Sequence, residues 1–403
     1  MKKILVTIIK FLKKEHISRY LVECLIFIVA LALFVIFSTD DVTSNVVGTV
    51  IGFLFSTMIL YLIKILTSHF EDVLKVNCNT EDLLKIYEGD PSYRKTIELN
   101  NTKVDVAYAD TFVNTGEYKF EVVDKPNKKF ELDDFILENY STIIQAHTSS
   151  KKINGETIRL DDFKINEKEK KAIFYLSRST YLNHLVTNRA IDFVLFDNLS
   201  LRHIYEYGPK LNSIANSKMS NHIGINGLVF LSDGNILVPR RKKNSTISKN
   251  KITSSIATKL DQPLTGGKKV TRNHLLYQNI INSLSARLKM KLEDLHTENV
   301  DVKFLGFGQS LYEAGKPQFY YSVVLKDIDT KKYYELNLDE TINQKIDADR
   351  CIYVADYNTY KFKKDKLCFE IIKKNGKRSK ITTGYEMSYL CNLWHYEQTK
   401  NNK

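Results

Sequence analysis

The sequence contains few of the residues and motifs that usually mark a disulfide-bonded or hydrolytic protein. Its 403 residues include only 5 Cys, 6 Pro, 16 Gly and 1 Trp. The cysteines have no regular spacing and form no CxxC pair, which excludes a disulfide scaffold and gives no support to a zinc site. There is no HExxH motif and no GxSxG elbow, so a zinc protease or a hydrolase triad has no support either. The sequence therefore predicts neither a metal nor a cofactor.

Charged residues are abundant, and basic residues outnumber acidic ones. Lys and Arg number 59 and Asp and Glu 47, so the formal net charge is 59 − 47 = +12. A chain of this length, 43% hydrophobic, can bury a sizeable core in two or three domains, which excludes disorder of the whole chain. The excess of basic residues favours an anionic partner such as a phosphate-bearing ligand or a membrane surface.

Two long apolar runs stand near the N-terminus. Leu21–Phe37 has Glu23 as its one charged residue, and Val46–Ile63 has none. Each is long enough to cross a bilayer as a helix. Basic residues precede the first run and Lys64 follows the second, so the positive-inside rule places both chain ends in the cytoplasm. A signal peptide is the alternative, but Lys10, Lys13 and Lys14 interrupt its apolar region too early and no cleavage site follows.

The predicted membrane anchor thus covers residues 1–70. In its second span, Gly48, Gly52 and Ser56 recur at a spacing of four, which lets helix backbones approach closely in lipid. These residues pack either within the hairpin of the two spans or between copies of the chain. Glu23 either reaches toward the lipid head groups or lines a water path in an oligomer.

The remaining sequence alternates short strand-like and helix-like stretches and predicts a cytosolic α/β region. Residues 71–215 form an α/β segment of undefined type, with strands expected over 104–107, 118–123, 172–177 and 193–196 and helices over 82–87, 132–140 and 199–207. From residue 216, Gly224–Leu231 reads as a buried strand that returns over Ile236–Pro239 through an Asp-Gly turn. The later predicted elements are a helix over 273–290, strands over 302–307 and 319–325, and a helix over 385–396.

Three stretches carry a resemblance to the Nudix fold, and they cover roughly residues 220–400. They are GINGLVFLSDGNILVPRRKK (224–243), GGKKVTRNHLLYQNIINSLSARLKM (266–290) and LGFGQSLYEAGKPQFYYSVVL (305–325). They look like the opening hairpin, the Nudix-box loop and helix, and the following strand pair. The resemblance implies two N-terminal transmembrane helices followed by a cytosolic α/β region that ends in a Nudix-like α/β/α sandwich over residues 216–403.

The residues that would make such a domain a hydrolase are missing. A catalytic Nudix helix needs clustered carboxylates to hold Mg²⁺. The corresponding positions are occupied by Asn282, Ser283, Leu284, Ala286 and Arg287. We therefore expect a non-catalytic ligand-binding domain. The alternative is a membrane-tethered, Mg²⁺-dependent Nudix hydrolase of a nucleoside diphosphate derivative with a shifted box.

A two-span anchor joined to a Nudix-like domain without its acidic box is similar to effectors of bacterial cyclic-oligonucleotide (CBASS) anti-phage systems. The phrases YLNHLVTN (181–188) and NSKMSNHIG (216–224) add to this resemblance to a SMODS-associated Nudix domain. It implies a protein of the bacterial inner membrane that binds a cyclic oligonucleotide made by a partner synthase, self-associates and disrupts the membrane lipids.

The residues themselves favour an anionic ligand near the predicted hairpin. Between Pro239 and Arg272 the chain has ten basic residues and a single acid, Asp261, which suits phosphate binding, contact with anionic lipids or a solvated loop. Base recognition needs aromatic faces or amide edges, and Tyr320 and Tyr321 must point to opposite faces of their strand. The predicted ligand-binding residues are Arg240, Arg241, Lys242, Arg272, Tyr277, Arg287, Tyr320, Asn188 and Asn221.

Overall fold

The computed structural model describes residues 79–89, 93–114, 116, 118–147, 154–196, 199–241, 250–260, 279–285, 297–336 and 350–401. The chain divides into two compact units, Met1–Asp72 and Val73–Lys403, and every described residue belongs to the second. The two predicted spans, with Glu23, Gly48, Gly52 and Ser56, lie outside the described residues. Within the described ranges, no helix combines the length and the apolar character needed to cross a membrane.

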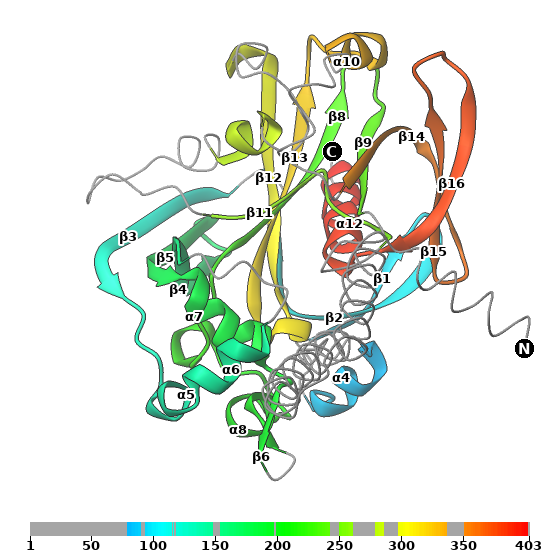
Figure 1. Ribbon diagram of the computed structural model, residues 1–403. Coiled ribbons are helices and arrows are strands. Elements are labelled where there is room, and N and C mark those ends of the chain that lie inside the picture. Colours follow the sequence, from blue (N-terminus) through cyan, green and yellow to red (C-terminus); the bar gives the residue numbers. More distant parts are fainter. Residues whose placement is uncertain are drawn as a thin grey trace, which may run out of the picture. The chain divides into compact units, whose positions relative to one another are not determined.

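One large mixed sheet forms the centre of the second unit (Figure 1). Its strands, in spatial order, are β1 (Arg94–Leu99), β2 (Thr102–Val113), β12 (Val300–Ser310), β13 (Lys316–Leu325), β8 (Gly224–Leu231), β9 (Ile236–Arg241), β10 (Lys251–Ile252), β16 (Arg378–Tyr385), β15 (Lys366–Ile372) and β14 (Arg350–Lys363), with β11 (Ile256–Lys259) also paired to β8. Because β2 pairs with β12, the segments 71–215 and 216–403 share this sheet. The predicted domain boundaries themselves stay predictions.

The last strands of this sheet close into a five-strand barrel. β9 pairs with β10, β10 with β16, β16 with β15 and β15 with β14, and β14 pairs back with β9. Apolar side chains from these strands are buried in a common core, among them Val238, Ile252, Leu367 and Phe369. The observed architecture is therefore mixed α/β with a closed barrel. The sequence did not predict this barrel, and the Nudix-like sandwich stays a prediction.

The large sheet has a different core on each face. Tyr321 lies in one core, together with Ile280 and Leu284 of the helical residues 279–285. Tyr320 lies in the other, together with Leu390 and other residues of α12 (Met387–Asn401). The prediction that the two tyrosines point to opposite faces is confirmed. Figure 1 shows α12 between the sheet and the barrel strands.

A smaller three-stranded sheet adds to the first core. It consists of β3 (Lys119–Lys129), β5 (Lys171–Thr180) and β4 (Glu156–Asn166). Phe174 of β5 packs within 5.6 Å, between ring centroids, of Phe307 on β12. The contact joins the two sheets through aromatic side chains, which bury large apolar areas.

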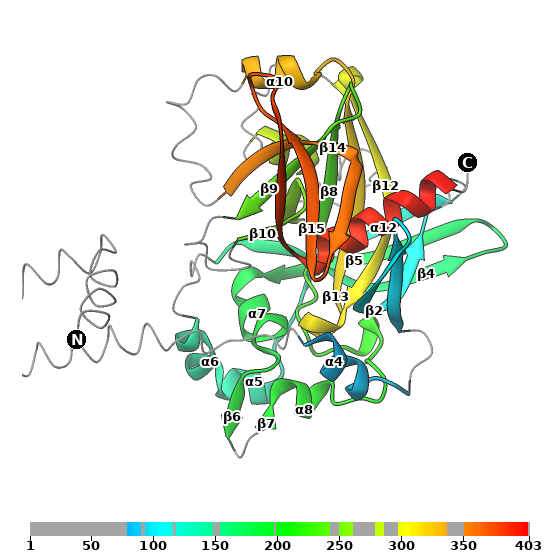
Figure 2. The same ribbon diagram turned by 90° about the vertical axis from the view of Figure 1, so that its right-hand side faces the viewer.

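Short helices gather at one end of the unit (Figure 2), and several of them contribute to a third core. They are α4 (Thr80–Ile86), α5 (Asp134–Glu138), α6 (Tyr140–Ala146), α7 (Tyr181–Val186), the 3-10 helices η1 (Asn188–Ala190) and η2 (Ile214–Asn216), and α8 (Leu201–Tyr205), with the hairpin of β6 (Val194–Phe196) and β7 (Leu199–Ser200). The remaining described helices are η4 (Thr297–Asn299), η5 (Leu311–Glu313) and α10 (Thr330–Leu336). The third core holds Ile136, Leu201 and Met219.

The predicted local elements agree with the structure where turn and cap signals are strong. The hairpin of β8 and β9 has the expected turn, with the amide of Gly234 bonded to the carbonyl of Leu231 at 3.0 Å. Two helix predictions need correction. The helix expected over 132–140 is two helices, because the chain turns at Asn139 between α5 and α6. The helix expected over 199–207 begins as strand β7, because Ser200, the N-cap of α8, has an extended backbone and the helix starts only at Leu201.

One buried residue of α12 makes a test of this packing. Asn392 is fully buried, and neither atom of its side-chain amide has a hydrogen-bond partner in the described part of the chain. An unsatisfied buried polar group costs about 1–3 kcal/mol. We expect Asn392→Leu to raise the melting temperature by a few degrees in a thermal unfolding scan.

The matched control for that variant is Asn226→Leu. Asn226 is also buried, but its amide donates to Gln318 Oε1 at 2.8 Å and its carbonyl oxygen accepts from Ser254. This control is expected to lower the melting temperature, because the buried side chains of Gln318 and Ser254 lose their hydrogen-bond partner. A comparable loss of stability in both variants would mean that water or a ligand satisfies Asn392.

Candidate functional site

A group of buried and partly buried polar and charged side chains surrounds residues 217–222, the segment that leads into β8. We call this group the loop cluster. Its members come from α7, η1, the 217–222 segment, β11, η5 and β13, and they are Tyr181, His184, Asn188, Arg189, Asn221, His222, Lys259, Glu313 and Lys316. Residues distant in sequence thus converge at one place, as binding sites require.

Two asparagines hold the centre of the loop cluster. The side-chain amide of Asn188 donates to Asn221 Oδ1 at 3.0 Å and to the carbonyl oxygen of Glu313 at 2.8 Å. In return, the backbone amide of Asn221 donates to Asn188 Oδ1 at 2.9 Å. Asn221 has a φ of 44°, a left-handed conformation that Asn tolerates better than most residues. The sequence prediction named both residues, and the structure brings them together.

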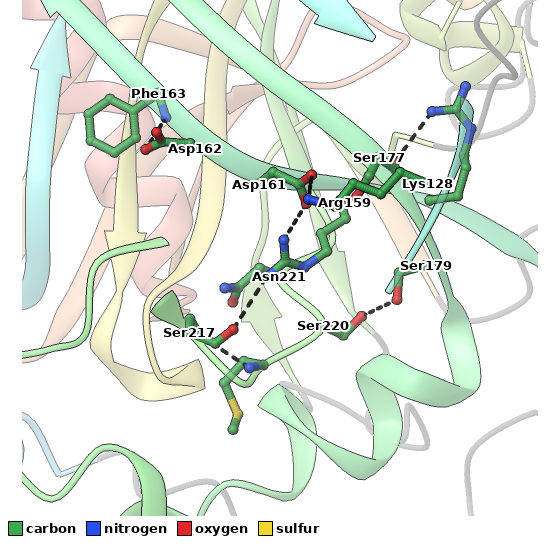
Figure 3. Close-up of polar contacts among 12 residues, drawn as sticks. Lys128, Arg159, Asp161, Asp162, Phe163, Ser177, Ser179, Ser217, Ser220 and Asn221 are labelled. Carbon is green, nitrogen blue, oxygen red and sulfur yellow. Dashed lines mark hydrogen bonds and ion pairs between the residues drawn. The ribbon is translucent and has the colours of Figure 1, made fainter. Parts of the chain in front are cut away.

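The small sheet supports the 217–222 segment from one side (Figure 3). Arg159 of β4 donates to the carboxylate of Asp161 and to the carbonyl oxygen of Ser217. The hydroxyls of Ser179 and Ser220 lie 2.7 Å apart. These bonds join β4 and β5 to the segment that carries Asn221 and His222.

Asp161 stays ionised among these contacts between the small sheet and the 217–222 segment. Burial acts to raise the pKa of Asp161, but hydrogen bonds from Lys128 and Ser177 and the charge of Arg159 outweigh it and hold the pKa below its ordinary value. Lys128 Nζ lies 2.7 Å from Asp161 Oδ2. The ionised Asp161 therefore fixes Arg159 against the 217–222 segment.

Two histidines lie face to face inside the loop cluster. The ring centroids of His184 and His222 are 3.7 Å apart, and both side chains are buried. Burial lowers the pKa of each well below its ordinary value, and the charge of Lys316 lowers both further. Both rings are therefore neutral at pH 7, where each presents one hydrogen-bond donor and one acceptor.

Cations outnumber carboxylates around this pair. Glu313 lies 3.1 Å from Lys316 Nζ and 3.6 Å from an Arg189 nitrogen. Burial acts to raise the pKa of Glu313, but the charges of Lys316 and Arg189 keep it below its ordinary value. Lys259 adds a third cation, with its Nζ 6.0 Å from the centre of the Tyr181 ring. With neutral histidines, the loop cluster has a net positive charge that suits an anion.

Several buried polar atoms of this region have no hydrogen-bond partner in the part of the chain that the structure describes. They are Asn221 Nδ2, His184 Nδ1, His222 Nδ1, Arg159 Nε and Thr157 Oγ1. Buried polar atoms are almost always paired in folded proteins. Their concentration around one segment therefore marks a place where a ligand or water can supply the missing partners.

Three other predicted ligand-binding residues are described by the structure, and they do not join the loop cluster. Tyr320 lies on the opposite face of the sheet, with its ring centroid 4.5 Å from that of His395 on α12. Arg240 lies over the Tyr353 ring at 5.4 Å, and Arg241 pairs with Glu386 at 3.0 Å, so both contact the barrel strands and the start of α12. Lys242, Arg272, Tyr277 and Arg287 lie outside the described residues.

Sequence reasoning missed the charged and histidine members of the loop cluster. His184 and His222 stand within the two phrases that carried the resemblance, but only their asparagines were proposed as contacts. Glu313 of η5 and Lys316 at the start of β13 lie within the third stretch of the resemblance (305–325), but neither was proposed as a contact. Their shared role depends on contacts across more than ninety positions of sequence.

Within the described ranges, no group of three or more His, Cys, Asp or Glu side chains is placed to hold a metal ion. Comparison with known proteins adds no assignment. No protein-family model matches the chain. No curated protein matches it either.

Proposed function

We propose that the protein is a membrane-anchored receptor and effector that binds a cyclic oligonucleotide in the loop cluster. The observation that supports this is the coincidence of unpaired donors and acceptors on Asn221, His184 and His222 with the cations Arg189, Lys259 and Lys316. A phosphodiester needs the cations, and a base edge needs neutral hydrogen-bonding groups. The loop cluster has both within one group of contacting side chains.

The chemistry assigns a role to each part. Arg189 is partly exposed and carries a planar fork of donors that suits two phosphate oxygens. Asn221 Nδ2 and the free ring nitrogens of the histidines suit the polar edge of a base. Because the histidines stay neutral, each ring keeps one acceptor nitrogen as well as one donor for the edge of a base.

Effector action follows from coupling this binding to assembly. In the proposal, the bound messenger favours a conformation in which copies of the chain associate, and the predicted spans then disrupt the inner membrane. The ligand must bind the assembling state more tightly for this to work. A synthase that makes the cyclic oligonucleotide is the partner that this function requires.

The test measures binding and breakdown together. The full chain, purified in detergent, is melted with a panel of cyclic di- and trinucleotides, in EDTA and in Mg²⁺, and each ligand is then checked by chromatography. A rise in melting temperature in EDTA with one intact ligand is expected. Mg²⁺-dependent breakdown would instead favour the Nudix hydrolase, and no shift with any ligand would contradict nucleotide binding.

A single substitution locates the binding site. Arg189→Gln is expected to raise the dissociation constant of the active ligand about 10–100-fold, measured by titration calorimetry. The reason is that a charge-assisted hydrogen bond contributes about 1.5–3 kcal/mol to binding. The matched control is Arg378→Gln on the barrel, where Arg378 pairs with Glu370 at 2.8 Å. Equal affinities of the two variants for the ligand would show that the ligand binds outside the loop cluster.

A further inference from the structure

The described part of the chain exposes few large apolar side chains, and most of these lie at the helical end. Five such residues are exposed, and four of them are Leu137 (51%), Val194 (51%), Leu199 (40%) and Tyr207 (70%). We call these four the apolar end. They come from α5, the β6–β7 hairpin and the residues after α8. Exposed apolar side chains that gather in one place usually mark an interaction surface.

These segments are neighbours in the fold. The ring centroids of Phe135 on α5 and Tyr205 on α8 are 6.5 Å apart, and the Tyr205 hydroxyl donates to Asp133 Oδ1 at 2.6 Å. Val194 pairs with Ser200, the residue that caps α8. Both views of the molecule place α5, β6 and α8 at the same end (Figures 1 and 2).

The first described helix packs against this same end. Tyr87, at the end of α4, donates its hydroxyl hydrogen to the carbonyl oxygen of Glu206 at 2.6 Å and accepts from Arg202 at 3.1 Å. Tyr207 is the next residue after Glu206. The 78 residues that precede the first described residue contain the two apolar runs Leu21–Phe37 and Val46–Ile63. In the sequence, the predicted membrane spans therefore come directly before the helix whose end contacts Glu206, next to Tyr207 of the apolar end.

We propose that the apolar end inserts into the head-group layer of the bilayer that anchors the protein. The inference rests on the proposed membrane anchoring and adds a lipid contact for the cytosolic unit. Aliphatic side chains bury apolar area at this depth, and tyrosine is enriched at membrane interfaces. Lys210 is exposed, has no ion-pair partner among the described residues and follows Tyr207 closely, where it can meet a lipid phosphate.

The experiment places a fluorescent reporter at the apolar end of the full chain. Tyr207→Trp is reconstituted into phosphatidylcholine and phosphatidylglycerol vesicles that contain lipids brominated on their acyl chains. The native Trp394 is 6% exposed and gives the background signal. The control is Asn375→Trp, in the exposed turn between β15 and β16. Quenching several-fold stronger at position 207 than at position 375 is expected.

Further arms separate the possible outcomes. Adding Leu199→Asp to Tyr207→Trp is expected to reduce the quenching toward the control, because a carboxylate opposes insertion. Equal quenching at positions 207 and 375 in vesicle-bound protein would overturn the lipid contact alone. Fluorescence at position 207 that responds to protein concentration but not to brominated lipid would overturn it in favour of a second copy. Failure of the chain to float with vesicles would overturn the membrane anchoring as well.

Discussion

Replacing Arg178 by methionine is expected to lower the free energy of unfolding by about 3–5 kcal/mol, because it leaves a buried carboxylate without its cation. Arg178 on β5 is bonded to both carboxylate oxygens of Asp124 on β3, at 2.7 and 3.0 Å. Their side chains are 3% and 4% exposed. The other carboxylate near Arg178, Glu156 at 3.5 Å, is 55% exposed and has water as an alternative partner.

The double variant Arg178→Met with Asp124→Leu is the matched control. Replacing both members of a buried pair by apolar residues of similar volume is often neutral, so this variant is expected to recover most of the lost stability. Urea unfolding of the full chain, followed by the fluorescence of Trp394, measures both. A single variant as stable as the double variant would mean that water reaches Asp124 in the folded protein.

The same pair of variants links the fold to the candidate site. β5 continues from Arg178 to Ser179, whose hydroxyl lies 2.7 Å from that of Ser220 beside Asn221. Loosening β3 and β5 should therefore displace the 217–222 segment. In the proposed function, the nucleotide-induced rise in melting temperature is reduced in the single variant and returns in the double variant.

Features set by neighbouring residues could be predicted from the sequence. The Asp-Gly turn placed β8 and β9 correctly because its backbone conformation is local. The alternation of Tyr320 and Tyr321 follows from the geometry of any strand. Asn188 and Asn221 were named separately as binding residues; their reciprocal hydrogen bonds bring them together, and the binding role of both stays a prediction.

Features that depend on distant pairings could not be predicted. The barrel closes where β10, only two residues long, pairs in parallel with β16 more than a hundred residues later. So short a strand has no readable periodicity. The histidine pair likewise depends on α7 and the 217–222 segment meeting in space. Local charge density gave no indication that Arg240 and Arg241 contact Tyr353 and Glu386, and the role of both arginines in ligand binding stays a prediction.

Glu206→Gln is expected to stabilise the protein at pH 8 but not at pH 5. Glu206 is 2% exposed; its Oε2 accepts from the amide of Asn212 at 3.0 Å, while Oε1 has no partner among the described residues. Burial raises the pKa of Glu206 from 4.5 to about 7, against the opposing effects of Asn212 and Arg202. Arg202 is already committed to Asp192, at 2.5 and 2.9 Å.

The direction of this pH dependence follows from whether the folded or the unfolded protein binds the proton of Glu206 more tightly. Because the pKa is higher in the folded state than in the unfolded state, the folded protein binds more protons between pH 4.5 and about 7. The stability that protonated Glu206 contributes is complete below pH 4.5, falls through this window and is lost above about pH 7. A shift of this size corresponds to about 3 kcal/mol.

The measurement is the difference in unfolding free energy between Glu206→Gln and the unchanged protein at pH 5, 6, 7 and 8. Groups common to both proteins, including His184 and His222, cancel in this difference. Glu138→Gln, on the exposed side of α5, is the control for removing one carboxylate from the surface. A flat difference for Glu206→Gln would mean that Glu206 stays ionised in the folded protein. A difference in unfolding free energy that rises with pH would show that the Glu206 carboxyl, at the contact with Tyr87, is protonated in the folded protein near neutral pH.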